Sequence, residues 1–249
     1  MLNKVLLITG GSRGIGAATA LLAAQQGWAV GVNYSSHSKA ADQVVQQIIS
    51  QGGRATAVQA DVANEAQVLA MFDQVQSQLG RITGLVNNAG VVDAPSRVDE
   101  MSLERWRRMI DINIVGSFLC AREAVRRMST RHGGSGGAIV NLSSVAAVLG
   151  APGQYVDYAA TKGAIDTFTV GLAREVATEG IRVNGVRPGV IDTEIHASGG
   201  QPDRAQQLAP TIPMKRPGTA KEIANAIVWL LSDEASYATG SILDITGGR

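Results

Sequence analysis

Cysteine is almost absent from this sequence, and neither sign of charge predominates. Cys120 is the only cysteine, so an intrachain disulfide and a thiolate metal cluster are excluded, which fits a reducing compartment. With 22 basic and 21 acidic side chains the formal net charge is +1, so no global field attracts nucleic acid or an anionic membrane. A local arginine excess runs from Arg105 to Arg131, but glutamates interrupt it and few aromatic residues accompany it. This pattern favours solvated helix faces, and we expect no nucleic-acid partner.

Long apolar runs are missing as well. No segment approaches the ~20 apolar residues that a membrane span needs. The one apolar run near the N-terminus, Val5 to Ile8, is too short for the core of a signal peptide. The three histidines, His37, His132 and His196, lack the spacing of metal ligands, so each is assigned to the surface or a loop and no metal is expected. These absences predict a soluble, cytoplasmic protein that binds neither a membrane nor a metal.

What is present is a regular alternation of short apolar runs and helical patterns. No Pro/Ser-rich or charge-dense stretch divides the 249 residues, so we expect a single domain, 1–249. Nearly continuous apolar strands between helices are typical of a parallel sheet covered on both faces. We therefore predict an α/β, doubly wound Rossmann fold with one parallel sheet of about seven strands and helices on both faces.

The expected strands are Lys4–Thr9, Ala29–Tyr34, Ala55–Ala60, Gly84–Asn87, Ala138–Leu142, Arg182–Val186 and Ser241–Ile245. After a first helix that ends near Gly27, the expected helices are Ala40–Ser50, Glu65–Leu79, Leu103 to about Met128, Tyr155–Thr178 and a last one that ends at Leu231. A capping box, Thr219 to Glu222, marks the start of the last helix.

A glycine-rich turn, Thr9 to Gly16, follows the first expected strand. Glycines let the backbone approach a pyrophosphate, and the free N–H groups and dipole of the next helix face its negative charge. Because this turn opens the first strand–helix unit, it predicts a dinucleotide site. The residues assigned to it are Gly10, Ser12, Arg13, Gly14, Ile15 and Gly16.

The end of the second expected strand lacks an acidic residue. A site for NAD usually has one there to bind the ribose hydroxyls, whereas the first acidic residue of this chain is Asp42, in the next helix. Nothing there would repel a 2′-phosphate, which Arg13 and nearby serines could bind by charge-assisted hydrogen bonds. We therefore predict NADP (NADPH), with NAD as the less favoured cofactor. The contacts expected at this strand end are Asn33, Tyr34, Ser35 and Ser36.

Asp61 and Val62 follow the third expected strand and are placed to meet the adenine ring. The alternative for Asp61 is the N-terminal cap of the helix that begins at Glu65, and the two roles are compatible.

A tyrosine and a lysine lie four residues apart in the helix expected from Tyr155. Residues four apart share a helix face, so Tyr158 and Lys162 can reach into the same pocket. A nearby ammonium favours a phenolate, so Lys162 is expected to lower the pKa of Tyr158 from about 10 toward the working pH. Tyr158 is therefore a candidate general acid/base.

Together these motifs resemble the short-chain dehydrogenase/reductase family, from about Leu2 to Gly248. The matching residues are Thr9-Gly10-x-x-x-Gly14-x-Gly16, Asn87-Asn88-Ala89-Gly90, Asn113, Ser144, Tyr158-x-x-x-Lys162, and Pro188-Gly189 with Thr193. The resemblance implies an enzyme that interconverts a small carbonyl compound and a secondary alcohol by hydride transfer to or from its cofactor. It also implies a homotetramer, with the helices from Leu103 and Tyr155 packing between subunits.

The resemblance implies a role for each catalytic candidate. Tyr158 would be the general acid/base, and Ser144 would donate a hydrogen bond to the same substrate oxygen. Ser144 is preferred over the adjacent Ser143 because the family's catalytic serine is usually the second of such a pair. Lys162 would lower the pKa of Tyr158 and hold the nicotinamide ribose, and Asn113 would position a water in the proton relay.

Further contacts are also implied by the resemblance. Those to the cofactor are Asn88, Ala89, Gly90, Tyr158, Lys162, Pro188, Gly189, Ile191 and Thr193. Those to the substrate are Ser144, Ala146, Gln154, Tyr155, Tyr158 and Val190.

The segment from Asp192 to Gly218 is long and irregular, as binding loops and lids often are. We expect it to close over the substrate; the alternative is a disordered connector, and His196 within it is expected to face solvent. The subgroups that the chain resembles most are the β-ketoacyl-carrier-protein reductases and the glucose or ribitol dehydrogenases. Arg131 and Arg174 fall near positions where the carrier-protein reductases present basic residues.

A generic NADP-dependent carbonyl reductase or alcohol dehydrogenase is the favoured function. The alternatives are a 3-oxoacyl-carrier-protein reductase, a sugar or polyol dehydrogenase and, outside the enzymes, an NADP-binding regulatory protein without turnover.

Overall fold

Seven parallel strands form one sheet in the order β3-β2-β1-β4-β5-β6-β9. The computed structural model describes residues 4–249, so the beginning of the motif match, at Leu2, lies outside the described residues. The strands are β1 (Val5–Ile8), β2 (Ala29–Tyr34), β3 (Ala55–Gln59), β4 (Gly84–Asn87), β5 (Gly137–Leu142), β6 (Ile181–Pro188) and β9 (Ile242–Ile245). The predicted doubly wound Rossmann fold is confirmed.

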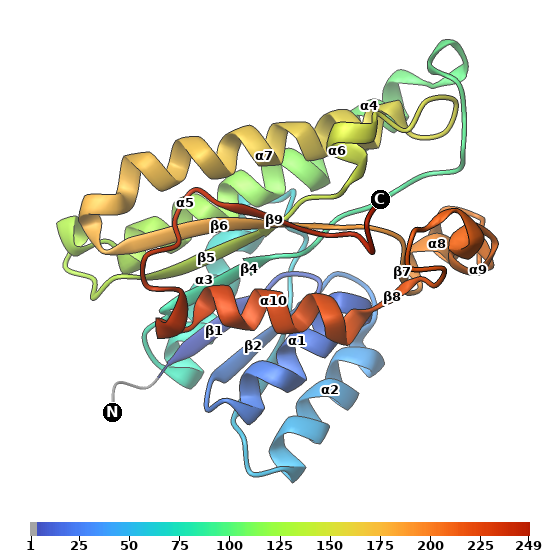
Figure 1. Cartoon of the computed structure of the whole chain (residues 1–249). Helices are drawn as coiled ribbons and strands as arrows, with labels where there is room; N and C mark the ends of the chain where they lie inside the picture. Colours follow the sequence, from blue (N-terminus) through green and yellow to red (C-terminus); the bar gives the residue numbers. More distant parts are fainter. Residues whose placement is uncertain (1–3) are drawn as a thin grey trace.

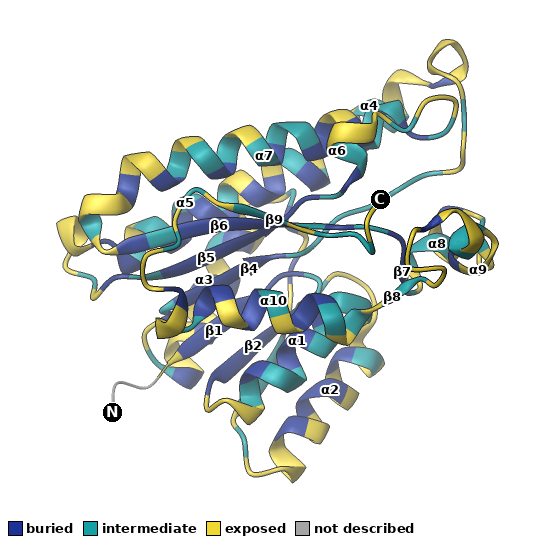
Figure 2. Cartoon of the chain, in the orientation of Figure 1, coloured by how far each residue is buried: buried dark blue, intermediate teal, exposed yellow. Residues whose placement is uncertain are grey.

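Helices cover both faces of the sheet (Figure 1). One face carries α1 (Gly14–Gln25), α2 (Ser38–Ser50) and α10 (Ala220–Leu231), and the other carries α3 (Glu65–Leu79), α5 (Gly116–Met128) and α7 (Val156–Val176). The five inner strands are almost entirely buried, the edge strands β3 and β9 are partly exposed, and the outer helix faces are exposed (Figure 2). Strands of this kind need apolar side chains on both sides, which is why their sequences are runs rather than alternations.

The order of the strands determines where a ligand can bind. β1 pairs with β2 on one side and with β4 on the other, so the direction in which strands are added to the sheet reverses at β1. The loops after β1 and β4 therefore diverge, which opens a crevice at the carboxyl ends of these strands.

Most predicted elements match the observed ones within two residues, but the stretch from Leu103 to Met128 is not one uniform helix. It consists of α4 (Leu103–Ile110), a π-helical turn (Asp111–Val115) and α5. A π turn bonds residues five apart instead of four, and a single such turn leaves an apolar pattern too similar to an α-helix to be recognised in sequence.

The segment after β6 is ordered, so the predicted alternative of a disordered connector is wrong. It contains β7 (Ile191–Asp192), α8 (Ile195–Ser198), α9 (Arg204–Leu208) and β8 (Gly218–Thr219), and β7 pairs with β8. Val190, Ala205 and Ile212 form a small apolar cluster beneath it. Within residues 4–249, no helix is both long and apolar enough to cross a membrane.

Candidate active site

A cavity of about 550 Å³ lies at the carboxyl ends of the central strands, bordered by the segments after β4, β5 and β6 and by α8 and α9. All six predicted substrate contacts line it: Ser144, Ala146, Gln154, Tyr155, Tyr158 and Val190. The predicted cofactor contacts that also line it are Ile15, Asn88, Gly90, Tyr158, Lys162, Pro188, Gly189, Ile191 and Thr193. The structure thus brings together residues that the sequence separates by more than 200 positions, since Ile15 and Arg249 both border the cavity.

The glycine-rich turn has a backbone that side chains would obstruct. Gly10 and Gly14 have φ angles of 61° and 54°, in the left-handed region that favours glycine. A Cβ atom at Gly16 would lie 2.4 Å from the carbonyl oxygen of Gly10, so only glycine fits there. Arg13 immediately precedes α1, and its side chain accepts no hydrogen bond from the helix. The N–H groups of the first turn therefore remain available to an anion. This cradle fits a dinucleotide pyrophosphate.

Two asparagine side chains form hydrogen bonds with the backbone of the glycine-rich turn. Asn33 is only 2% exposed; its Oδ1 accepts from the Gly10 N–H at 3.1 Å, and its Nδ2 donates to the Ala60 carbonyl at 3.1 Å. Asn88 donates from Nδ2 to the carbonyls of Thr9 and Gly10, both at 2.9 Å. The Asn33 side chain is therefore bonded to the protein itself, as a buried amide must be, and it supports the glycine-rich turn.

The end of β2 is open and free of acidic side chains, as predicted. Ser35 and Ser36 are exposed, and Tyr34 is partly buried. Arg13 is also exposed and donates to Ser198 Oγ at 3.3 Å, so its guanidinium lies beside α8.

Asp61 is not the cap of α3. Its Oδ1 accepts from the Ala63 N–H at 3.0 Å within its own turn, whereas Asn64 caps the helix by accepting from the Gln67 N–H at 3.1 Å. The sequence did not distinguish the two residues, because Asp and Asn both favour the N-cap position of a helix. Val62 is buried.

The adjacent serines after β5 point in different directions. Ser143 Oγ donates to the Lys162 carbonyl at 3.1 Å, so this hydroxyl binds the main chain of α7. Ser144 Oγ accepts from the Ala146 N–H at 3.1 Å, and its hydroxyl lies within hydrogen-bonding reach of the Tyr158 hydroxyl in the cavity. The geometry therefore favours Ser144 as the serine that meets a ligand.

Tyr158 and Lys162 share the inner face of α7. The Lys162 ammonium lies 5.6 Å from the centre of the Tyr158 ring and donates to the Leu142 carbonyl at 2.7 Å. Burial lowers the pKa of Lys162 to about 8, although the negative charge of Asp166 acts in the opposite direction. Burial raises the pKa of Tyr158 to about 12, and the hydrogen bond with Ser144 only partly offsets this.

The prediction that Lys162 brings the pKa of Tyr158 down toward neutral pH is therefore wrong for this structure. The removal of water from the phenol raises this pKa, and the influence that opposes it is the hydrogen bond with Ser144. The tyrosine is accordingly a protonated acid at neutral pH.

Asn113 lies in the π-helical turn and does not line the cavity. Its Oδ1 accepts from the Val91 N–H at 2.8 Å, and its Nδ2 donates to the Val91 carbonyl at 3.0 Å and to Thr161 Oγ1 at 3.2 Å. The side chain is thus fully bonded to the protein and supports the cavity wall. Gly90 lies between Asn113 and Lys162, because a Cβ at Gly90 would be 3.4 Å from Asn113 Oδ1 and 3.6 Å from Lys162 Nζ.

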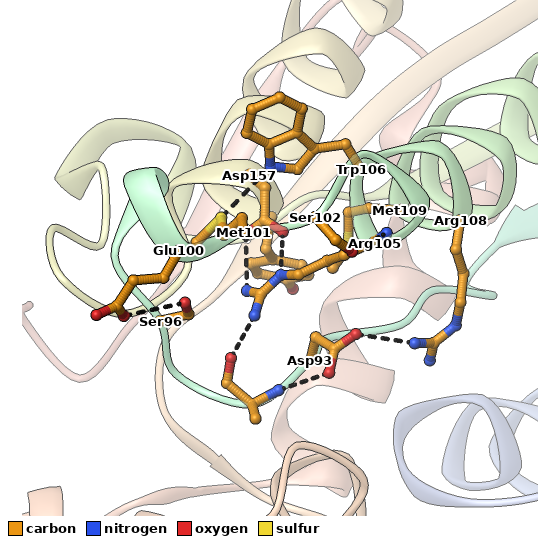
Figure 3. Close-up of polar contacts among 12 residues, drawn as sticks. Asp93, Ser96, Glu100, Met101, Ser102, Arg105, Trp106, Arg108, Met109 and Asp157 are labelled. Carbon is orange, nitrogen blue, oxygen red and sulfur yellow. Dashed lines mark hydrogen bonds and ion pairs between the residues drawn. The ribbon is translucent and has the colours of Figure 1, made fainter.

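The loop after β4 is anchored to the beginning of α7 (Figure 3). Arg105 of α4 donates to both carboxylate oxygens of Asp157, at 2.7 and 3.1 Å, and to the Ala94 carbonyl at 2.6 Å. The Ser96 N–H donates to the Gln154 carbonyl at 3.0 Å. The expectation that the arginines from Arg105 onward all lie on solvated faces is therefore wrong, since Arg105 forms a buried ion pair.

Two lid residues that line the cavity had escaped prediction. His196 borders the cavity and its Nε2 lies 2.9 Å from the Ile191 carbonyl, so the expectation that it faces solvent is wrong; burial lowers its pKa. Arg204, the first residue of α9, borders the same cavity. No local pattern marked either residue, because both reach the site through the fold of the lid.

Arg131 and Arg174 lie at the other end of the sheet. Arg131 follows α5 and precedes the beginning of β5, and Arg174 is in the last turn of α7. At 1.5 Å per residue, Arg174 is about 24 Å along the helix from Tyr158. These two arginines therefore cannot border the mouth of this cavity within one subunit.

A glycine cradle for a dinucleotide beside a buried tyrosine–lysine pair is typical of a nicotinamide-dependent oxidoreductase. A family model described as enoyl-(acyl carrier protein) reductase matches residues 10–249. The uncharacterized oxidoreductase YgfF of Escherichia coli is 56% identical over 98% of this chain and 99% of its own. A 3-oxoacyl-[acyl-carrier-protein] reductase of Synechocystis is 41% identical over 98% of this chain and 96% of its own.

Solved structures give the same result. A short-chain dehydrogenase/reductase variant from Serratia marcescens has a TM-score of 0.90 at 35% identity, covering 98% of this chain and 97% of its own. The acetoin dehydrogenase YohF from Salmonella typhimurium has a TM-score of 0.88 at 35% identity, covering 99% and 97%. The chain belongs to the short-chain dehydrogenase/reductase family. It is an oxidoreductase of a family that uses NAD(P) cofactors.

Proposed function

We propose that the protein is an NADP(H)-dependent oxidoreductase that interconverts a carbonyl and a secondary alcohol, with Tyr158 as the general acid/base. One observation carries this proposal: Tyr158, Ser144 and Lys162 converge on one cavity, and the Ser144 hydroxyl, unlike that of Ser143, is not bonded to the main chain of α7 and lies beside the Tyr158 hydroxyl. Proton donors that meet at one point are what the reduction of a carbonyl oxygen requires.

Each side chain has a distinct task during reduction. Tyr158 gives its phenolic proton to the carbonyl oxygen, and Ser144 donates a hydrogen bond to the same oxygen as negative charge develops there. The Lys162 ammonium, 5.6 Å from the ring, stabilises the phenolate that remains. When bound, the nicotinamide supplies a hydride to the carbonyl carbon during reduction and accepts one during oxidation.

The cofactor would be held by the glycine-rich turn and by the ends of β2, β3 and β4. The backbone from Gly10 to Gly16 suits a pyrophosphate, and the segments around Asp61 and Gly90 suit the adenine and nicotinamide halves. The exposed Ser35 and Ser36, with no acidic neighbour at the end of β2, support a preference for the 2′-phosphate of NADP. Asn113 contributes by holding Val91 and the wall beside Gly90.

The segment from Asp192 to Gly218 would close over the substrate. Its helices α8 and α9 supply His196 and Arg204 to the cavity, which supports a lid. A second candidate is a 3-oxoacyl-carrier-protein reductase, because the Synechocystis relative carries that name. Within one subunit, Arg131 and Arg174 lie away from the cavity and do not support this second candidate.

A homotetramer is supported by exposed apolar side chains on adjacent helices. Ile110, Val115 and Phe118 are 45%, 38% and 40% exposed, and Phe118 stacks on Phe168 of α7 with the ring centres 3.9 Å apart. Surfaces of this kind commonly mark subunit contacts. Light scattering should give about four times the monomer mass of 25.9 kDa.

The decisive experiment is NADPH oxidation with a panel of neutral ketones, 3-oxoacyl thioesters and sugars, followed for the wild type and Tyr158→Phe. We expect turnover of at least one class by the wild type and a loss of about 100-fold or more in kcat for the variant. Tight NADPH binding without turnover of any compound would instead support a regulatory protein.

A further inference from the structure

The segment from Asp192 to Gly218 contributes to the cavity an arginine, Arg204, that pairs with no acidic side chain among residues 4–249. Arg204 is partly buried, and its guanidinium lies 5.0 Å from the centre of the Tyr155 ring. Its Nη1 donates to Gln201 Oε1 at 3.0 Å and its Nη2 to Gln154 Oε1 at 2.7 Å. Both acceptors are neutral amides, so the hydrogen bonds of Arg204 bring no negative charge to its guanidinium.

The side chains of the surrounding cavity do not supply the missing negative charge. Among the described residues that line it there is no aspartate or glutamate side chain, and Arg204 forms no hydrogen bond with Arg249, which also borders it. By contrast, the well-buried Arg105 and Arg187 each bond an aspartate, Asp157 and Asp166 respectively. A guanidinium in a concave site without a counter-ion is a common means of binding a carboxylate.

We propose that Arg204 binds a carboxylate of the substrate, so that the enzyme acts on short oxo acids or the corresponding hydroxy acids. This inference rests on the proposed function of the same cavity. The planar fork of arginine matches the two oxygens of a carboxylate, and the amides of Gln154 and Gln201 can rotate to donate to the same group.

The position of Arg204 limits the length of the substrate. Tyr155, over which the guanidinium lies, is the residue before α7 and precedes Tyr158 by three positions. Arg204 and Tyr158 border the same cavity of about 550 Å³, so a carboxylate at Arg204 and a carbonyl at Tyr158 must both fit within it. A cavity of this size suits a small oxo acid better than a long acyl chain.

The cofactor phosphates are a competing source of negative charge, but they belong elsewhere in the site. Arg204 contacts Gln154 and Tyr155, on the side of α7, whereas Arg13 of the glycine-rich turn contacts Ser198. Removal of the Arg204 charge should therefore leave the KM for NADPH unchanged.

The test compares Arg204→Gln and Arg204→Lys with the wild type, on pairs of 2-, 3- and 4-oxo acids and their methyl esters. Lys221→Gln, at an exposed position of α10 outside the cavity, is the control that loses the same charge. We expect the wild type to prefer at least one acid over its ester by about tenfold or more, because a charge-assisted pair is lost with the ester. Arg204→Gln should lose this preference through a higher KM, with ester reduction and the KM for NADPH within about twofold of the wild type. Arg204→Lys should be intermediate.

Two outcomes would overturn the proposal. In one, the wild type prefers the ester in every pair; in the other, Arg204→Gln reduces acid and ester turnover by the same factor, as a purely structural residue would. Binding of butanoate and butanamide to the NADPH-loaded protein, measured by calorimetry, separates this proposal from the proposed function. If no carbonyl compound is turned over but butanoate binding depends on Arg204, the reaction is wrong and the anion site stands. If esters are reduced and neither acids nor butanoate depend on Arg204, the reaction stands and the anion site is wrong.

Discussion

Arg105 of α4 and Asp157 of α7 form a two-point ion pair between residues 52 positions apart in the chain, with side chains only 11% and 6% exposed (Figure 3). Asp157 immediately precedes Tyr158, and the same guanidinium binds the Ala94 carbonyl of the loop after β4. One side chain therefore fixes both the beginning of α7 and the loop after β4.

Breaking the Arg105–Asp157 pair should lower the stability of the protein. Asp157→Asn leaves Arg105 buried without its counter-charge, so we expect a loss of about 3 kcal/mol in the free energy of unfolding, measured by denaturant titration. Asp99→Asn is the matched control, because the Arg97–Asp99 pair is 71% and 64% exposed and should contribute less than about 1 kcal/mol. Equal losses in the two variants would contradict the anchoring role of Arg105.

Removal of the Tyr158 hydroxyl should abolish proton donation without preventing cofactor binding. We expect Tyr158→Phe to lower kcat by about 100-fold or more while the dissociation constant for NADPH, measured by fluorescence titration, stays within about threefold. Tyr237→Phe is the control, since Tyr237 is fully exposed and does not line the cavity. Undiminished turnover by Tyr158→Phe would show that another group donates the proton.

The pKa values predict the pH dependence of reduction. With a pKa of about 12, Tyr158 stays protonated across the accessible range, whereas Lys162 loses its proton as the pH rises through about 8. The positive charge that stabilises the phenolate is present below that pH and lost above it. We therefore expect kcat/KM for reduction to be level below about pH 7 and to fall above about pH 8. Lys162→Met should lack this decline, and a wild-type profile that stays level to about pH 9.5 would contradict the assignment.

The glycine cradle makes a steric prediction. A Cβ at Gly16 would meet the Gly10 carbonyl, which belongs to the backbone and cannot rotate away, so Gly16→Ala should weaken NADPH binding by about tenfold or more. Gly171→Ala, at an exposed position of α7 where a Cβ meets nothing within 4 Å, should bind NADPH like the wild type. Calorimetry with NADPH distinguishes the two variants, and unaltered binding by Gly16→Ala would remove the turn from the cofactor site.

The cofactor preference can be tested by adding the acidic residue that β2 lacks. Ser36→Asp would place a carboxylate at an exposed position beyond the end of the strand, where it repels a 2′-phosphate and accepts from ribose hydroxyls. We expect the KM for NADPH to rise by about tenfold or more and the KM for NADH to change little. A wild-type enzyme that already binds NADH more tightly than NADPH would reverse the prediction.

The sequence was sufficient to predict the fold because its signals are local. The bounds of α3 and β4 match the prediction, and the Thr219–Glu222 capping box marks the beginning of α10 as observed. The spacing of Tyr158 and Lys162 likewise needs only one helix to bring both groups to one face.

The features that could not be predicted depend on distant parts of the chain. The Arg204–Gln154 and Arg105–Asp157 contacts join residues 50 and 52 positions apart, and no local pattern records such pairs. The pKa of Tyr158 was predicted in the wrong direction for the same reason. The adjacent lysine is visible in the sequence, but the burial that raises the pKa of Tyr158 arises only from the fold.

The π-helical turn between Asp111 and Val115 has a consequence for the orientation of side chains on either side of it. One extra residue in a helix rotates everything beyond it by about 100° relative to an uninterrupted α-helix. Because of this offset, α4 can direct Arg105 toward α7 while α5 directs Cys120 and Ala124 into the core beneath the sheet. A deletion of one residue within the turn would restore regular helical bonding. It would also remove the offset, so the Arg105–Asp157 ion pair and the core contacts of Cys120 and Ala124 could not form together.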